Sequence, residues 1–501
     1  MRLFPKRIKE FGMKNICDCG ALILGSRQEK RGDHLIFPRR SRKCPVPFSL
    51  SLFMFWSSIC LGSQADFATQ IKALQAKTIP QAYVGIMVME ADTGKIIFNQ
   101  NGDGYFCPAS NTKLFTVVSA LKYLGADYQF STNLRFDPEK IKAGALNGDV
   151  TLEFRGDPSF EVKDLRFLLS SLKKYKIKKI VGNLIIDNMR FSPPYYAPGW
   201  TINSQNWYYS APVRSVIINQ NLVKFSVTPS PTLGGKVSFT QLSEDLPAIL
   251  VKQDVTTVTE SEADTQCSLL LAVNNNEIQL GGCWPKTGGA KTVKIALDNP
   301  DGLAKKLVQS ILKEEGVRLS GDILFEKNTL LKIQETHTSL PLKELLGPLL
   351  KDSNNLYAES ILKTLGYEKY QKGSFQMGVL AVQDILQKDL GLNFTKLYLS
   401  DGSGASRYNL ISPRQVAELL LVIYKHLEIR ENIMDALPVY DKEGEGFRAK
   451  TGTADGISAL SGYIKVKDKT FIVAILINET IHDQAALQKF EHSVFDRVRS
   501  L

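Results

Sequence analysis

The feature that most constrains the fold is a change of texture inside the chain. Between about residues 130 and 290, short runs rich in β-branched residues alternate with clusters of Gly, Pro and Asn, a pattern typical of β-rich modules. Apolar residues recur at helical spacing over 114–121 before this stretch and over 303–312 after it. A β meander is expected over 446–477. The sequence therefore predicts one α/β (α+β) domain that is split by a β-rich insert.

The predicted boundaries follow from these changes and from the character of the N-terminus. We expect a leader over residues 1–65, the first part of the split domain over 66–128, the β-rich insert over 129–292 and the second part over 293–501. The insert is long enough for one or two subdomains. No internal repeat is apparent.

The leader has the layout of a secretory signal peptide. An uncharged apolar run over 48–62 follows four basic residues over 39–43, and Ser63-Gln64-Ala65 offers small residues for a cut after Ala65. Fifteen apolar residues are short for a membrane span, which needs about 20. The basic stretch before the run is unusually long, which suggests a misassigned start codon. We expect export to the periplasm or cell envelope, with no stable membrane span after cleavage.

The positive charge of the chain is concentrated in this leader. Lys and Arg number 62 and Asp and Glu 51, a formal charge of +11, of which residues 1–65 carry +8. The remaining +3 over 66–501 gives no electrostatic reason to bind nucleic acid. We therefore expect no nucleic-acid partner.

Three cysteines remain after the leader, and two of them suggest a disulfide. Cys267 and Cys283 flank two strand-like runs, so a hairpin turning at Asn275 would place them opposite each other at a distance compatible with a bridge. Export to an oxidising compartment favours that bridge; two buried thiols are the alternative. Cys107 has no evident partner. The four remaining histidines show no H-E-x-x-H or paired spacing, so no metal or cofactor is expected.

The first candidate for chemistry is the sequence Ser110-Asn-Thr-Lys113. Pro108 opens a helix here, and Ser110 and Lys113 lie on one face of its first turn. A serine hydroxyl needs a neighbouring base, and a partly desolvated lysine can serve as one. The helix N-terminus adds N–H groups where an oxyanion would develop. On its own the pattern fits an N-cap serine and a solvated lysine equally well.

Two further motifs follow in the chain. Ser353-Asn354-Asn355 offers a hydroxyl and an amide two positions apart, although such residues often form turns or caps. Lys450-Thr451-Gly452-Thr453, before the meander, could present a cation and hydroxyls to a carboxylate, and its Gly allows close approach of a substrate backbone. A second K-T-G at Lys286 is rejected as a turn, because it lies in a Gly-rich loop inside the insert and precedes Ser353.

The order S-x-x-K, S-x-N, K-T-G is the constellation of serine β-lactamases and penicillin-binding proteins. The segments FCPASNTKLFTVVSALKYLGADYQFSTNL, GDPSF, GNLIIDNMRFSPPYYAPGW, SNNLYAESILKTLG, DGSGASRYN and AKTGTADGISALSGYI extend the likeness. Over roughly residues 75–499 the chain resembles the D-Ala-D-Ala carboxypeptidase/endopeptidase family. This is the low-molecular-mass penicillin-binding branch with a large insert between the first two motifs.

The resemblance implies a transpeptidase-like domain of the β-lactamase/penicillin-binding type and a serine D-Ala-D-Ala carboxypeptidase or DD-endopeptidase. Its substrates would be peptidoglycan stem peptides and cross-links, and β-lactams would inhibit it covalently. No cofactor is implied. The implied roles are nucleophile for Ser110, general base for Lys113, proton relay for Ser353, substrate orientation for Asn355, and binding of the terminal carboxylate for Lys450, Thr451 and Thr453 beside Gly452. The N–H groups of Ser110 and Thr453 would form the oxyanion hole.

Some points stay open at this level. A serine β-lactamase shares the motifs, and an idle cell-wall binding protein could retain the fold. Carboxypeptidase and endopeptidase activity expose the same D-Ala carbonyl and are not separated. Asp157 and Asp187 are candidates for contacts to the diamino-acid side chain of the stem peptide. The segment 401–404 fits either a family loop near the site or a Gly-rich turn.

Overall fold

The computed structural model describes residues 53–265, 267–287, 289–393, 396–440 and 446–501, and before Asp66 it describes no side chain. Residues 59–501 form one compact unit, and of residues 1–58 only the start of helix α1 (Phe53–Thr78) is described. The predictions about the signal peptide and the start codon therefore lie mostly outside the described residues. Among the described residues, no helix is long and apolar enough to cross a bilayer.

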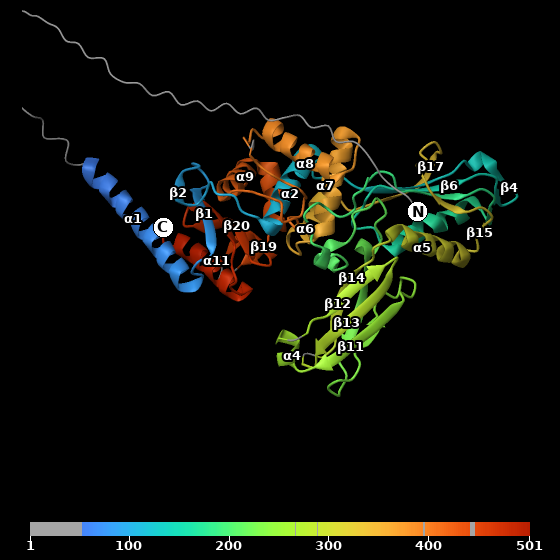
Figure 1. Cartoon of the computed structure of the whole chain (residues 1–501). Coiled ribbons are helices and arrows are strands. Elements are labelled where there is room, and N and C mark those ends of the chain that lie inside the picture. The colour runs from blue at the N-terminus through green and yellow to red at the C-terminus, as the bar shows by residue number, and fades with distance from the viewer. Residues whose placement is uncertain (1–52, 266, 288, 394–395, 441–445) are drawn as a thin grey trace, which may run out of the picture. The chain divides into compact units, whose positions relative to one another are not determined.

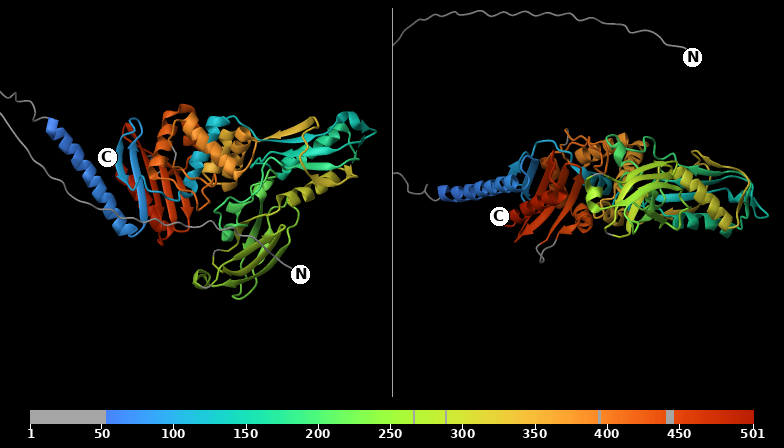
Figure 2. Two further views of the ribbon diagram at one scale, coloured as in Figure 1. Left: turned by 45° about the horizontal axis from the view of Figure 1, so that its top comes forward. Right: turned by 60° about the horizontal axis from the view of Figure 1, so that its bottom comes forward.

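Strands from both ends of the compact unit form one six-stranded antiparallel sheet (Figure 1; Figure 2, left). Its order is β18–β19–β20–β21–β1–β2, with these bounds: β1 (Tyr83–Glu90), β2 (Ile96–Gln100), β18 (Val439–Tyr440), β19 (Phe447–Ala454), β20 (Ile457–Val466) and β21 (Lys469–Asn478). β1 pairs with β21 along its whole length. The predicted meander is confirmed as β19–β20–β21.

Helices cover both faces of this sheet, which is why its central strands β1, β20 and β21 are buried along most of their length. Ile86 and Val88 of β1 belong to the core cluster that α1 and α11 (Gln484–Val498) complete. Met87 and Met89, which alternate with them, belong to a second cluster on the opposite face. The helices of that second cluster are α2 (Thr112–Tyr123), α6 (Leu342–Leu350), α7 (Asn355–Tyr370), α8 (Phe375–Asp384), α9 (Pro413–Lys425) and α10 (Leu427–Ala436). The mixed fold class is confirmed.

The stretch predicted as an insert is rich in short strands. Their bounds are β3 (Ser131–Arg135), β4 (Ile141–Lys142), β5 (Ala145–Leu146), β6 (Val150–Phe154), β7 (Lys179–Ile180), β8 (Leu184–Asp187), β9 (Leu222–Thr228), β10 (Ser238–Gln241), β11 (Val251–Val258), β12 (Leu270–Asn274), β13 (Glu277–Pro285) and β14 (Lys291–Ala296). Helices α3 (Val162–Ser170) and α4 (Glu260–Thr265) also lie here.

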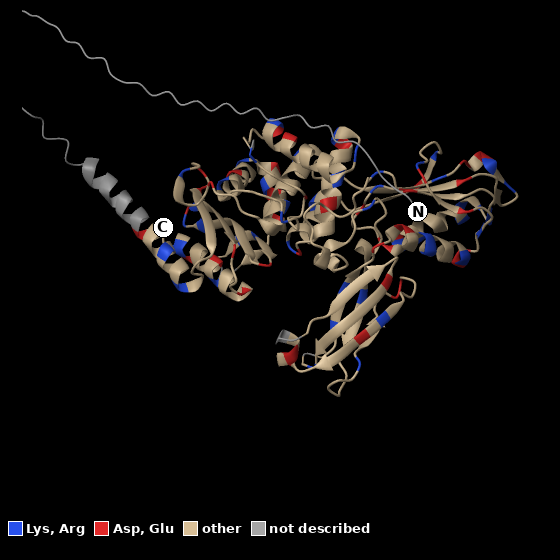
Figure 3. Ribbon diagram, viewed as in Figure 1, with Lys and Arg blue, Asp and Glu red and all other residues tan. Residues whose placement is uncertain are grey.

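Elements beyond residue 292 share one hydrophobic core with the strands of this stretch. Strands β16 (Ile323–Phe325) and β17 (Ile333–Thr338) complete the sheet β16–β8–β6–β3–β17, and β15 (Arg318–Leu319) pairs with β7. Helix α5 (Pro300–Glu314) packs its apolar face into that core. The strand-rich character agrees with the sequence analysis, whereas the domain boundaries stay a prediction. Acidic and basic residues are interspersed along the described elements (Figure 3).

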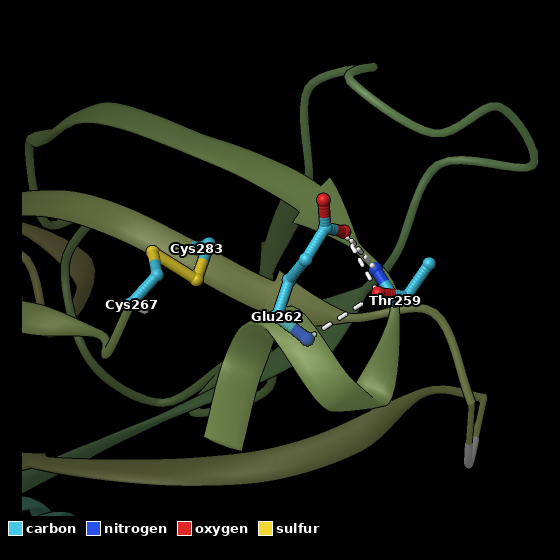
Figure 4. The surroundings of a disulfide bond; sticks show 4 residues. All are labelled: Thr259, Glu262, Cys267 and Cys283. Carbon is cyan, nitrogen blue, oxygen red and sulfur yellow. Dashed lines mark hydrogen bonds between the residues drawn. A yellow bond between two sulfur atoms is a disulfide. The ribbon is translucent and has the colours of Figure 1, made fainter. Parts of the chain in front are cut away.

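A disulfide joins Cys267 to Cys283 on β13, with an S–S distance of 2.07 Å and Cα atoms 5.8 Å apart (Figure 4). β12 and β13 form the expected hairpin, with Asn274 opposite Glu277. The turn thus comprises Asn275 and Asn276, both at positive φ, instead of centring on Asn275. Two-residue hairpin turns match the twist of the strands and favour Asn in this conformation, which explains the one-residue difference.

Candidate active site

Ser110 lies in a tight 3₁₀ turn, Ala109–Asn111, that leads directly into α2. Ala109 has φ +44°, in the left-handed region that is strained for a residue with a β-carbon. Two glycines from other segments pack closely against this turn. A β-carbon at Gly404 would come within 1.8 Å of the Ala109 carbonyl oxygen, and one at Gly452 within 3.0 Å of the Ser110 nitrogen. Backbone packing from two distant segments therefore fixes the position of Ser110.

Lys113, one turn into the helix, is fully buried and has three partners. Its Nζ lies 2.9 Å from Ser110 Oγ, 2.7 Å from Asn355 Oδ1 and 2.8 Å from the Ser403 carbonyl oxygen. Burial lowers the pKa of Lys113 to about 7, against the opposing charges of Asp401 and Glu359. A neutral amine has two N–H donors and one lone pair, so the two carbonyl acceptors leave the lone pair facing Ser110. The arrangement can take a proton from the serine hydroxyl.

Asn355 is the first residue of α7, where it links two parts of the site. Its Oδ1 accepts from Lys113, and its Nδ2 donates to the Tyr209 carbonyl at 2.7 Å. The preceding Asn354 is the N-cap of the helix, and its Oδ1 accepts from the Tyr357 N–H. Asn355 therefore orients Lys113 from a helix end that is itself held against residues 208–210.

Ser353 precedes this helix and faces the third motif. Lys450 Nζ donates to Ser353 Oγ at 2.9 Å and to the Thr451 carbonyl at 2.9 Å. The Lys450 side chain is buried, and burial, followed by the charge of Lys113, holds its pKa well below the ordinary value. Ser353 has φ +55°, a second strained position at the site. Because Ser353 Oγ accepts from Lys450, its own proton is free to be donated elsewhere.

Strand β19 supplies one wall of a cavity of about 820 Å³. Thr451 and Thr453 line it together with Ser110, Ser353 and Asn355. β18 pairs with β19 at residues 447 and 448, and the Ala449 N–H donates to the Pro438 carbonyl; beyond Ala449 no described strand pairs with this edge of β19. An open strand edge beside a nucleophile suits a peptide that binds in an extended form. Residues of the strand-rich region, Tyr208, Tyr209 and Lys294 among them, line the cavity as well.

The structure thus brings all eight predicted catalytic and substrate-binding residues to one place: Ser110, Lys113, Ser353, Asn355, Lys450, Thr451, Gly452 and Thr453. The rejected second K-T-G is not among the cavity's lining residues; there the Thr287 hydroxyl donates to Glu260. In the segment 401–404, the Ser403 carbonyl contacts Lys113 and Gly404 lines the cavity.

Asp157 and Asp187, the candidates for side-chain recognition, do not line the cavity. Asp187 accepts from the N–H groups of Met189 and Asn328, which is a structural role. Asp157 is buried, which raises the pKa of its carboxyl, and one of its oxygens lacks a partner among the described residues. Nowhere among the described residues does a group of three metal-binding side chains occur.

Three contributors to the site were not predicted from the sequence. Glu359 accepts from the N–H groups of Gly402 and Ser403, next to the carbonyl that contacts Lys113. Glu359 could have been found from the sequence, since a charged residue four positions after Asn355 falls on the same helix face. The Tyr209 and Ser403 carbonyls are backbone atoms, for which residue type carries no signal.

Comparison with known proteins agrees with this geometry. The model of the D-Ala-D-Ala carboxypeptidase 3 (S13) family matches residues 67–498. D-alanyl-D-alanine carboxypeptidase DacB of Haemophilus influenzae is 29% identical over 436 residues, which cover 84% of this chain and 89% of that protein.

Two solved structures show the same likeness in three dimensions. The crystal structure of penicillin binding protein 4 from Haemophilus influenzae matches with a TM-score of 0.78 and 29% identity, over 86% of this chain and 99% of that one. The same protein in complex with a β-lactam matches with a TM-score of 0.73 and 28% identity, over the same shares of both chains.

Proposed function

The chain belongs to the D-Ala-D-Ala carboxypeptidase 3 (S13) family, and from that membership we propose how its residues divide the work of a serine-type carboxypeptidase. Ser110 is the nucleophile, and it forms an acyl-enzyme with the penultimate D-Ala of a peptidoglycan stem peptide. The observation that carries this proposal is the position of Lys113, whose Nζ lies between Ser110 Oγ and two carbonyl acceptors.

In the first step, Ser110 Oγ attacks the carbonyl carbon of the penultimate D-Ala while its proton moves to Lys113. The N–H groups of Ser110 and Thr453 stabilise the oxyanion. The contact of Gly452 with the turn supports this pairing, because it brings the β19 backbone against the Ser110 nitrogen.

In the second step, the C–N bond breaks, Ser353 gives its proton to the leaving amine of the terminal D-Ala and regains one from the Lys113 ammonium, so that Lys113 is neutral again. The Lys450–Ser353 hydrogen bond supports this relay, since Ser353 accepts from Lys450 and donates onward. Thr451 and Thr453, which line the cavity, bind the terminal carboxylate together with Lys450. Water then hydrolyses the ester, and Lys113 again serves as the base.

Cross-links between stem peptides contain the same D-Ala carbonyl, so the same machinery also serves DD-endopeptidase activity. The open edge of β19 and the size of the cavity support the binding of an extended, branched peptide. We place the enzyme in the periplasm or cell envelope, where its substrate occurs. β-Lactams would acylate Ser110, an expectation that the β-lactam complex of the Haemophilus influenzae protein supports.

Intact-mass spectrometry after brief incubation with benzylpenicillin tests the nucleophile. We expect a persistent one-to-one adduct on the wild-type protein and none on Ser110→Ala. Ser119→Ala is the matched control, because Ser119 is a buried serine of the same helix that donates only to the Phe115 carbonyl. It should be labelled like the wild type.

The remaining outcomes assign the alternatives. Consumption of the drug without an adduct would indicate a β-lactamase, and an intact drug without an adduct an idle binding protein. Release of D-Ala from a pentapeptide stem, compared with cleavage of a cross-linked muropeptide dimer, then measures carboxypeptidase against endopeptidase activity.

A further inference from the structure

Glu359 is a fully buried carboxylate that the reaction as described does not use. It lies on α7 four residues after Asn355, so the two side chains share a face of the helix. Oε2 of Glu359 accepts from the Gly402 N–H and Oε1 from the Ser403 N–H, both at 2.9 Å. A buried carboxylate is costly unless such hydrogen bonds satisfy it, and here both oxygens are satisfied by one short backbone segment.

That segment presents its carbonyl groups to α2. The Gly402 carbonyl accepts from Thr116 Oγ1 at 2.7 Å, and the Ser403 carbonyl accepts from Lys113 Nζ at 2.8 Å. In a trans peptide unit the N–H and C=O groups point in opposite directions. The unit that carries the Ser403 N–H also carries the Gly402 carbonyl, so Glu359 aims that carbonyl from α7 toward Thr116 of α2. The Ser403 carbonyl belongs to the next unit, together with the Gly404 N–H.

The two carboxylates at this segment differ in origin. Asp401 belongs to the segment itself, and its Oδ1 accepts from the Gly404 N–H at 2.9 Å, which anchors the peptide unit that carries the Ser403 carbonyl. Glu359 comes from a different element, the helix whose first residue holds the same lysine. Asn355 and Glu359 thus act on Lys113 from one helix face, the first directly and the second by fixing the peptide unit before Ser403, while Asp401 fixes the unit after it.

We propose that Glu359 is a positioning residue for the reaction, which keeps Lys113 aligned with Ser110 by holding the backbone of residues 402–403. The proposal rests on the role of Lys113 as general base given above. An amine that lost the Ser403 carbonyl would be free to rotate away from the serine hydroxyl, and small misalignments of a catalytic base are costly.

Charge gives this residue a second, separable effect. The charged groups that face Lys113 are Glu359 on α7, Asp401 on the 401–404 segment and Lys450 on β19. Those that act on Glu359 are Asp401 and Lys363, one turn further along α7. Burial and Asp401 raise the pKa of Glu359 to about 8, while its hydrogen bonds with residues 402 and 403 oppose that rise. When ionised, Glu359 raises the pKa of Lys113.

Two variants separate position from charge. Glu359→Gln keeps the length of the side chain but offers only one acceptor oxygen and no charge. Glu359→Asp keeps the charge but is one methylene too short to hold both N–H groups. Glu491→Gln is the matched control, since Glu491 on α11 is also buried with its pKa raised to about 8 and does not line the cavity.

The measurement is the second-order rate of acylation by benzylpenicillin across pH, expressed per site that finally becomes labelled, with thermal unfolding in parallel. We expect the rate to fall about 10- to 100-fold in both Glu359 variants and to stay unchanged in Glu491→Gln. The acylation rate falls on the acid side of its pH profile, where Lys113 becomes protonated. Because ionised Glu359 raises the pKa of Lys113, this acid limb moves to lower pH in Glu359→Gln, which never carries the charge, and stays in place in Glu359→Asp.

The rate per labelled site counts only folded enzyme, so a variant that is merely less stable keeps the wild-type rate. The proposal would be overturned if both Glu359 variants kept the wild-type acylation rate and Glu359→Gln kept the wild-type pH profile, whatever their melting temperatures. An equal fall of the acylation rate in Glu491→Gln would overturn it too. If one Glu359 variant does not fold, the other decides. Failure of the wild-type protein to be acylated would refute the proposed function instead.

Discussion

Helices α2 and α7 each bury one lysine, and the two side chains are alike in everything except their partners. Lys113 and Lys363 are both fully buried, and burial lowers the pKa of each to about 7. Lys363 Nζ donates to three carbonyl oxygens, those of Ser192, Pro194 and Val213, at 3.0 to 3.1 Å. Lys113 replaces one of those carbonyls with a serine hydroxyl.

This difference separates the proposed base, Lys113, from Lys363, whose contacts are structural. Three carbonyls match the three N–H donors of an ammonium group and offer no proton to abstract. Two carbonyls and a hydroxyl leave the lone pair of the neutral amine facing a hydroxyl, which can give up a proton. Burial and a lowered pKa are therefore shared by both lysines, and the identity of the third acceptor decides which one performs chemistry.

The largest expected effect that tests this comparison is that of Lys113→Met on acylation. Removal of the base should lower the acylation rate by about 10² to 10⁴-fold. Thermal stability should fall less than in Lys363→Met, since two carbonyls instead of three lose their donor, while in both variants an amine no longer has to be desolvated. The rate is measured by stopped-time labelling with benzylpenicillin, and stability by calorimetry. A rate near that of the wild type would remove Lys113 from the mechanism.

Lys363→Met should give the opposite pattern. Three buried carbonyls lose their partner, which we expect to reduce the free energy of unfolding by about 1–3 kcal/mol. The acylation rate per labelled site should stay close to that of the wild type, because the contacts of Lys113 are untouched. Urea unfolding with labelling on the same samples checks both values. A selective loss of acylation in the stable fraction would contradict the comparison.

The smallest expected effect is on the pH dependence of stability. Between the folded pKa near 7 and the unfolded pKa near 10.4, the unfolded chain holds protons that the folded chain lacks, so stability rises with pH in this window. Each Met variant should make that slope shallower. The acid limb of acylation near pH 7 should persist in Lys363→Met, as rates measured between pH 5 and 9 would show; its disappearance would mean that Lys363 also acts on the reaction.

Much of this arrangement could be predicted from the sequence, because its side chains form motifs that can be recognised there. Ser110 and Lys113 had to share a helix face once Pro108 marked the start of the turn, and the order of the three motifs suggested that they would meet. The β meander followed from the sequence as well, and the structure has it.

The rest depends on atoms or on long-range packing that residue type does not encode. The Ser403 and Tyr209 carbonyls contact the site through the backbone, so no pattern of side chains predicts them. The core shared by α5, β16 and the strand-rich stretch depends on sheet pairing between residues far apart, which composition does not register. A turn of two asparagines instead of one required knowledge of hairpin geometry.

The pairing of β1 with β21 also has a consequence for the order of events in synthesis. Ser110 and Lys113 emerge early, but the glycine that presses on their turn from β19, and the strand that completes the sheet beside β1, are among the last residues to be made. Sheets closed by such distant partners form late in folding. If Ser110 is the nucleophile as proposed, a growing chain therefore carries it before the site around it is complete, and the site forms only when the C-terminal strands have been made.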